Sequence, residues 1–235
     1  MLVKNVMTKN PVTISPECSV TEARALMNKN NIGKLPVVDK NFKLVGMVTK
    51  NDLAKSAPSQ ATTLDMYEIS YLLSKLTVEK IMVRDVVTVP DTEVVENAAK
   101  VMLEKGIGCV PVMSGDLVVG ILTESDLFSL FTEMFGATRS GVRVVFSLDD
   151  KPGQLAKIVD EIAKKNGNLV SLVTRELKDS SLRRVTMKVS GISKEQIEEI
   201  LSKHGNVLEF VQLQINYFDW EYKKAKELYD VARKH

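Results

Sequence analysis

Residues 6–53 read VMTKNPVTISPECSVTEARALMNKNNIGKLPVVDKNFKLVGMVTKNDL, and residues 81–127 read IMVRDVVTVPDTEVVENAAKVMLEKGIGCVPVMSGDLVVGILTESDL. The second stretch repeats the first, because identical residues recur at one constant offset: Met7 and Met82, Thr13 and Thr88, Ala23 and Ala98, Gly33 and Gly108, Pro36 and Pro111. The offset falls by one at the next pair, Gly46 and Gly120, which fits a deletion in the turn at 114–116. A repeat of this length predicts two duplicated supersecondary units and not an array of short solenoid turns.

Each copy carries the same β-α-β-β-α pattern of apolar spacing. In the first copy the predicted elements are strand 12–14, helix 20–30, strands 34–38 and 44–49, and a helix from residue 50. In the second copy they are strand 86–89, helix 94–105, strands 109–113 and 117–123, and helix 124–135. We expect Ser19 to cap the first of these helices, and Asp91 or Thr92 to cap its counterpart.

Composition places the chain among packed globular proteins. Of its 235 residues 44% are hydrophobic and 26% are charged, and the formal charge of +2 is too small to indicate nucleic-acid binding. No apolar stretch is long enough to span a bilayer, and the N-terminus has no secretory h-region, so we expect a cytoplasmic protein. Cys18 and Cys109 lack the spacing of a disulfide framework or a metal site, so we interpret both as small buried hydrophobes.

A nucleotide-binding hypothesis rests on the motif G-h-h-T-x-x-D, which occurs at 46–52 and again at 120–126. In each copy it lies where a buried strand passes into a helix. Such a junction offers backbone N–H groups to an anion, and a carboxylate one turn later can accept two hydrogen bonds from a ribose diol. The alternative is that the Thr caps the helix and the Asp complements its dipole. Two copies, each preceded by Gly-x-h-Pro-Val, make the pattern specific.

With these motifs the first 130 residues resemble a cystathionine-beta-synthase (CBS) domain pair. The resemblance implies two β-α-β-β-α units related by pseudo-twofold symmetry, with clefts that take AMP, ADP, ATP or S-adenosylmethionine. It implies ribose contacts for Asp52 and Asp126, and ribose or phosphate contacts for Thr49, Asn51, Thr123 and Ser125. The other implied cleft residues are Thr13, Gly33, Lys34, Leu35, Pro36, Thr88, Gly108, Cys109, Val110 and Pro111. Lys34, Lys50, Arg84 and Lys105 are candidate phosphate cations, and because Cys109 and Glu124 replace Lys34 and Lys50 in the second copy, we expect unequal affinities.

The pattern changes after residue 141. Strand 142–148, helix 154–165, strands 169–176 and 183–189, helix 193–203 and strand 206–214 predict a ferredoxin-like antiparallel sheet with helices on one face. We expect Pro152 in the first helical turn. The D-K-P-G-x-L loop at 150–155 and the entry Gly167-Asn168-Leu169 resemble an ACT domain. That resemblance implies an amino-acid site at Asp150, Gly153, Leu155 and Asn168. The alternative is a loop that only caps a helix and a sheet that only dimerises.

The whole chain is therefore predicted to be an α+β protein. We divide it into CBS repeat 1 (1–55), a linker helix (56–76), CBS repeat 2 (77–135), a linker (136–141), an ACT-like domain (142–214) and an amphipathic C-terminal helix (215–235). This combination resembles the acetoin-utilisation protein B family.

The function expected from this organisation is ligand sensing by a homodimer that regulates another protein. No P-loop, metal cluster or nucleophile with an adjacent base occurs, so we predict no catalysis, no metal and no required cofactor. We also expect no membrane and no direct nucleic-acid contact. The alternative function is a dimerisation scaffold that binds no ligand.

Overall fold

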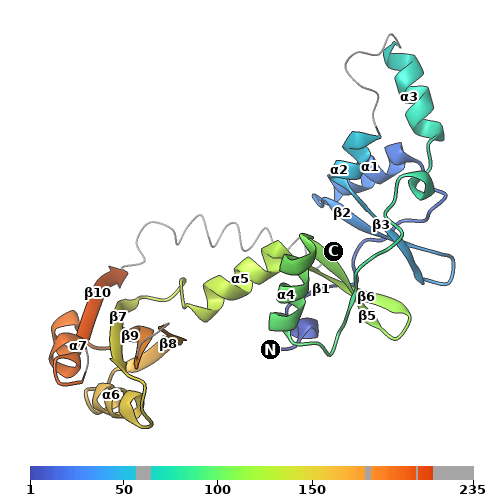
Figure 1. Cartoon of the computed structure of the whole chain (residues 1–235). Helices are drawn as coiled ribbons and strands as arrows, with labels where there is room; N and C mark the ends of the chain where they lie inside the picture. The colour runs from blue at the N-terminus through green and yellow to red at the C-terminus, as the bar shows by residue number, and fades with distance from the viewer. Residues whose placement is uncertain (57–64, 178–180, 205, 214–235) are drawn as a thin grey trace. The chain divides into compact units, whose positions relative to one another are not determined.

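The computed structural model describes residues 1–56, 65–177, 181–204 and 206–213 (Figure 1). By its contacts the chain divides into two compact units, Met1–Leu127 and Phe128–His235, and each is described by itself. The predicted tail helix at 215–235 and part of the predicted linker helix, residues 57–64, lie outside the described residues.

The first repeat forms the predicted helix and hairpin. It contains α1 (Val20–Lys29), β2 (Lys34–Val38), β3 (Leu44–Thr49) and α2 (Lys50–Lys55), and α3 (Met66–Lys75) follows it. Ser19 caps α1 as predicted, because its side chain accepts a hydrogen bond from Glu22 N while the Glu22 carboxylate accepts one from Ser19 N. The expected strand 12–14 is reduced to a single parallel bridge between Ile14 and Val37.

The second repeat contains β4 (Val89–Pro90), α4 (Val95–Lys105), β5 (Cys109–Ser114), β6 (Leu117–Thr123) and α5 (Glu124–Met134). The prediction that Asp91 or Thr92 caps its first helix is wrong. The N-cap of α4 is Val94, which makes no side-chain cap bond. Asp91 N instead donates to Met113 O, which continues the pairing of β4 with β5, and the Glu93 carboxylate accepts from Val94 N at 2.9 Å.

The entry segments of the two repeats are exchanged. Two short 3-10 turns, η1 (Val3–Asn5) and η2 (Val78–Lys80), precede them. Strand β1 (Thr8–Lys9), at the start of the first repeat, pairs with β6 of the second in the sheet β1-β6-β5-β4. Conversely, Val83 at the start of the second repeat exchanges both backbone hydrogen bonds with Met47 of the first, each 2.9 Å. Each repeat is therefore completed by residues that the sequence assigns to the other, so the two pack as one unit.

The core of the first unit lies under α1. Val20, Ala23 and Met27 of this helix are fully buried, together with Leu35 and Val37 of β2. Cys18 packs at the margin of this core, and both it and Cys109 are only partly buried, so the expectation of two buried cysteines holds in part.

The second unit has the predicted ferredoxin-like order. Its elements are β7 (Gly141–Asp149), α6 (Gln154–Lys164), β8 (Asn168–Glu176), β9 (Leu182–Ser190), α7 (Lys194–Leu201) and β10 (Asn206–Leu213). All strand pairs are antiparallel, in the order β10-β7-β9-β8. Pro152 precedes the helix and does not lie in its first turn, because Gly153, with a φ of 82°, is the N-cap of α6.

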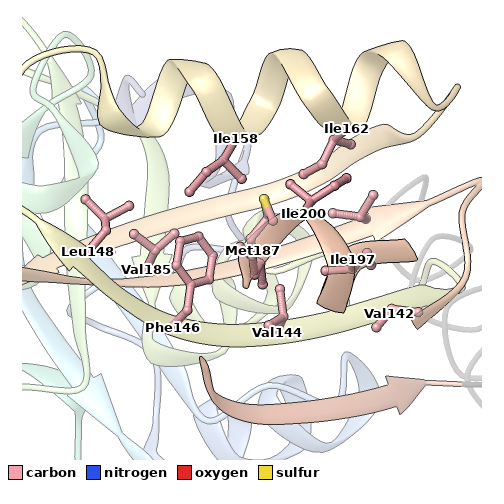
Figure 2. Packing of buried hydrophobic residues seen from close by; sticks show 12 residues of the cluster. Val142, Val144, Phe146, Leu148, Ile158, Ile162, Val185, Met187, Ile197 and Ile200 are labelled. Atoms are coloured by element: carbon pink, nitrogen blue, oxygen red, sulfur yellow. The ribbon is translucent and has the colours of Figure 1, made fainter. Parts of the chain in front are cut away.

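Both helices of the second unit cover the same face of its sheet. Figure 2 shows Ile158 and Ile162 of α6 and Ile197 and Ile200 of α7 packed over Phe146 and its neighbours on the sheet. All four isoleucines are almost completely buried. Alternate residues of β7 and β9 therefore point into this core, and the residues between them form the opposite face of the sheet.

Candidate functional site

A cleft of about 530 Å³ lies between the two repeats of the first unit. This volume is within the range of small-molecule sites. The lining residues come from the β2–β3–α2 region of the first repeat, from the segment that enters the second repeat, and from its β5 and the start of α5: Gly33, Lys34, Met47, Thr49, Lys50, Asn51, Val83, Asp85, Val86, Val87, Ile107, Gly108, Cys109, Pro111 and Glu124.

The cleft brings together about half of the predicted nucleotide-binding residues. Those that line it are Gly33, Lys34, Thr49, Asn51, Gly108, Cys109 and Pro111. Those outside its lining are Thr13, Leu35, Pro36, Asp52, Thr88, Val110, Thr123, Ser125 and Asp126. Leu35 and Val110 are fully buried core residues, since alternate residues of a strand face opposite ways. Of the remaining cation candidates Lys50 lines the cleft, whereas Arg84 and Lys105 do not.

Asp52 acts on the cleft through Thr49. Its Oδ2 atom accepts hydrogen bonds from Thr49 N at 2.8 Å and from Thr49 Oγ1 at 2.6 Å. In return Asp52 N donates to Thr49 Oγ1 at 3.3 Å, which completes a capping box at the start of α2. Asp52 and Thr49 therefore cap the helix, as the alternative interpretation of the motif predicted. The same hydrogen bonds hold the Thr49 hydroxyl in place at the wall of the cleft.

Asp126 repeats this capping box but is more enclosed. Thr123 N and Thr123 Oγ1 donate to its Oδ2 atom at 2.9 and 2.7 Å, and Thr8 Oγ1 lies 3.5 Å from Oδ1. Only 3% of Asp126 is exposed, whereas Asp52 is half-buried. The second copy of the motif is therefore less accessible than the first.

The charges of the cleft are mixed. Lys34 and Lys50 carry positive charge, and Asp85 and Glu124 carry negative charge. Lys34 Nζ crosses between the repeats and donates to Gly108 O at 2.6 Å. Burial raises the pKa of the Cys109 thiol, against the opposing effect of Lys34, so this cysteine is kept as an uncharged wall of the cleft.

Thr88 lies in a different hollow, between the tips of the two hairpins. Lys43, Leu44, Pro90, Met113, Gly115 and Asp116 complete its lining. Lys43 Nζ and Asp116 Oδ2 form an ion pair there at 2.9 Å. This hollow is separate in its lining residues from the cleft that contains Thr49.

The four predicted amino-acid-binding residues are divided between the two ends of the second unit's sheet. Asp150 and Gly153 follow the end of β7, whose Asp149 pairs with Leu182. Asn168 begins β8 and pairs with Ser190, at the other end of β9. Leu155 packs against the core. One copy of the unit therefore does not bring Asn168 next to Asp150.

Asp150 already has a partner. Arg183 Nε and Nη2 donate to its two carboxylate oxygens at 2.8 and 3.0 Å. These hydrogen bonds lower the pKa of the Asp150 carboxyl. An amino-acid ligand at this loop would compete with Arg183 for that carboxylate.

Six residues of the cleft lining were not predicted from the sequence: the apolar Met47, Val83, Val86, Val87 and Ile107, and the acidic Asp85. Residues 83–87 occupy the repeat position of residues 8–12, which lies outside the two motifs. The constant offset of the repeat marks this segment, but its place in the cleft follows from the exchange of entry segments, which a single sequence does not reveal.

Two matches decide the family. The model of the CBS domain matches residues 3–59 and 78–133. A CBS domain-containing protein of Dictyostelium discoideum is 32% identical over 135 residues, which are 57% of this chain and 93% of that protein. The chain belongs to the CBS-domain family. A TTHA0829-like ACT domain matches residues 140–210, so the protein combines a CBS pair with an ACT domain.

Other relatives share the CBS pair. A putative acetoin utilization protein (AcuB) from Vibrio cholerae has a TM-score of 0.50 and 29% identity, and the match covers 59% of this chain and 95% of that one. The L-aspartate semialdehyde sulfurtransferase of Methanocaldococcus jannaschii is 37% identical over 55% of this chain. The chain spans only 23 to 40% of the length of this and other curated archaeal relatives.

Some solved CBS structures hold adenosyl ligands. The CBS domain pair of protein MJ0100 was solved with 5′-methylthioadenosine and S-adenosyl-L-methionine, and CBSX2 was solved with AMP. They are 35% and 29% identical to this chain, and each match covers 59% of this chain and 98% of that one. Both have TM-scores of 0.47.

Within the described ranges, no helix is long and apolar enough to cross a membrane. In the same ranges no three His, Cys, Asp or Glu side chains are grouped as ligands for a metal ion.

Proposed function

We propose that this protein is a regulatory sensor that binds an adenine nucleotide, AMP, ADP, ATP or S-adenosylmethionine, in the cleft between its CBS repeats. The observation that carries the proposal is that one cleft of suitable volume combines lysines, fixed polar groups and apolar walls from both repeats. A ligand held by both repeats changes how they pack, and this change is what a partner reads.

The lining of the cleft offers the kinds of contact that a nucleotide needs. Met47, Val83, Val86 and Ile107 offer an apolar slot for the adenine ring. Lys34 and Lys50 supply the charge for a phosphate or a carboxylate. Thr49 is held in place by Asp52 and can bond the ribose or phosphate.

The acidic residues limit the charge of the ligand. Asp85 and Glu124 balance the two lysines, so the cleft has no surplus positive charge for a long polyphosphate. In the second motif Asp126 is buried, and neither Thr123 nor Ser125 lines the cleft. We therefore propose one preferred nucleotide site per chain, at the first motif.

An amino acid at the ACT domain is a finer part of the proposal. Since Asp150 and Asn168 lie at opposite ends of one sheet, a site that uses both requires two copies of the domain. This part therefore depends on the homodimer.

We also propose that the chain regulates and does not catalyse. The described part of the cleft contains the weak nucleophile Cys109, whose pKa is raised by burial, and no histidine to activate it. The regulated protein is expected to be a separate chain, and the site of action to be the cytoplasm.

A dimerisation scaffold is the second candidate, because α5 exposes an apolar stripe. Phe128, Phe131 and Met134 are 70%, 57% and 57% exposed. Large exposed apolar side chains at helical spacing mark an interface. A homodimer through α5 is compatible with sensing. The scaffold alone is favoured if no ligand stabilises the protein.

A thermal-shift screen of AMP, ADP, ATP, S-adenosylmethionine and the amino acids tests the sensor. A ligand at 100 times its Kd stabilises by about 2.7 kcal/mol, which for a chain of this size raises Tm by about 5 to 11 °C. Lys34→Gln and Lys50→Gln should remove the shift, whereas Lys55→Gln, on the exposed side of α2, should keep it. Lysine variants suit this test better than Asp52→Ala or Asp126→Ala, which also remove helix caps. No shift with any ligand in the parent protein contradicts the proposal.

A further inference from the structure

The face of the ACT sheet that lies opposite α6 and α7 carries several basic residues, and we call it the open face. Opposite the helix-covered face, the paired strands β7, β9 and β8 present alternate residues: Arg143, Val145 and Ser147; Arg184, Thr186 and Lys188; Ser171, Val173 and Arg175. Four of these nine residues are basic, and Val145, Ser147 and Lys188 are buried. The acidic Asp149 follows on the same face, at the end of β7. None of these nine residues lines the CBS cleft.

The basic residues are opposed in like-charged pairs. Arg175 of β8 is the register partner of Arg184 of β9, and Arg143 of β7 is the partner of Lys188. Directly opposed side chains have Cβ atoms about 4.5 to 5.5 Å apart, and like charges at that distance are destabilising. Some other contact must therefore offset each pair.

For Lys188 the protein itself supplies the contacts that compensate the repulsion. Its side chain is 1% exposed, and Nζ donates to Gly136 O at 2.7 Å and to Arg139 O. Burial lowers the pKa of this amine. Lys188 thus fastens residues 136–139 over one end of the open face and is not available to a ligand.

For Arg175 and Arg184 no such offset is present among the described residues. Neither side chain forms an ion pair or a hydrogen bond there, and the buried Nε of Arg184 has no acceptor. The adjacent Arg183, which points to the helix-covered side, does have side-chain partners. It has Asp150, Glu176 and Thr174 as partners. Among the described residues of β8 and β9, the arginines without a partner therefore lie on the open face.

We propose that Arg175 and Arg184 form a binding site for a multiply charged oxyanion, a phosphate or a dicarboxylate, on the open face of the ACT sheet. Two planar guanidinium groups side by side match the oxygens of such an anion, and binding it removes their mutual repulsion. Ser147, the register partner of Arg184 on β7, is buried and is not part of the proposed site. In the register of β10, Glu209 pairs with Val145, so it belongs to the next row of the face.

The test is a titration of the full-length protein with inorganic phosphate and with succinate at constant ionic strength, followed by ¹⁵N–¹H NMR. The reporters are the backbone amides of Ser147, Arg175 and Arg184. We expect saturable shifts at these amides with at least one of the two anions, and the tighter anion identifies the class. Because the reporters lie in the ACT domain, phosphate that binds the CBS cleft does not mimic the result.

Arg175→Gln and Arg184→Gln should each raise the apparent Kd at least tenfold. Arg143→Gln removes the same charge from the other end of the same face and should change Kd less than twofold. The proposal is overturned if neither anion gives saturable shifts, or if Arg143→Gln weakens binding as much as Arg184→Gln. Since none of the three variants changes a residue that lines the cleft, nucleotide binding should be the same in all three.

Discussion

At the residue scale, the two copies of the T-x-x-D motif differ in burial and should differ in stability. Asp126 is 3% exposed and Asp52 is half-buried, although both hold their threonine in the same way. Loss of a cap costs about 0.5 to 2 kcal/mol, and a buried donor without its acceptor costs about 1 to 3 kcal/mol. Asp126→Ala should therefore lower the free energy of unfolding by more than Asp52→Ala. Urea denaturation measures both, and the reverse order would show that the burial difference has no energetic effect.

The Asp150–Arg183 pair gives a pH dependence at the same scale. Hydrogen bonds from Arg183 lower the pKa of Asp150 in the folded state. The contribution of this carboxylate is therefore present above its unfolded pKa of about 3.9 and is lost as the pH falls through the lower folded value. Asp150→Asn should flatten the fall of the urea midpoint at acidic pH. Identical profiles for Asp150→Asn and the parent protein would contradict the assignment.

At the element scale, the exchanged entry segments pass close to two glycines, Gly46 and Gly120. A Cβ on Gly46 would lie 2.9 Å from the carbonyl oxygen of Val83, whereas the three atoms nearest to a Cβ on Gly120 all belong to the side chain of Met7. Backbone cannot move aside as a flexible methionine can. Gly46→Ala should therefore cost about 1 to 3 kcal/mol of stability, as overpacking usually does, and Gly120→Ala should cost less. Equal effects in chemical denaturation would argue against the close approach of Val83.

The same scale shows what sequence can and cannot predict. Apolar spacing located the hairpin of β2 and β3 to the residue, because β-branched alternation depends only on near neighbours. It failed where a distant partner decides. The hydrogen bond from Asp91 N to Met113 O extends β4 and delays the start of α4, and Ile14 keeps only one bridge of an expected strand. The same holds for the residues of the site. Lys34 and Thr49 were predicted because they belong to local motifs, whereas Val83 and Asp85 reach the cleft only because the entry segments of the two repeats are exchanged.

At the scale of the whole molecule, the chain divides into two compact units with separate cores. The core of the second unit shares no residue with the core of the first CBS repeat, so we expect two unfolding transitions in differential scanning calorimetry. An adenine nucleotide should raise the temperature of one transition only, and Lys34→Gln should abolish that rise. A single transition that shifts as a whole would indicate that the units unfold together.

The most direct test of the sensor is isothermal titration calorimetry of the full-length protein with AMP, ADP, ATP and S-adenosylmethionine. We predict that one of these ligands binds with about one preferred site per chain. The Lys34→Gln and Lys50→Gln double variant should weaken that binding at least tenfold, while Lys55→Gln leaves it unchanged. If the double variant binds as tightly as the parent protein, or if none of the four ligands binds, the cleft between the CBS repeats is not a nucleotide site.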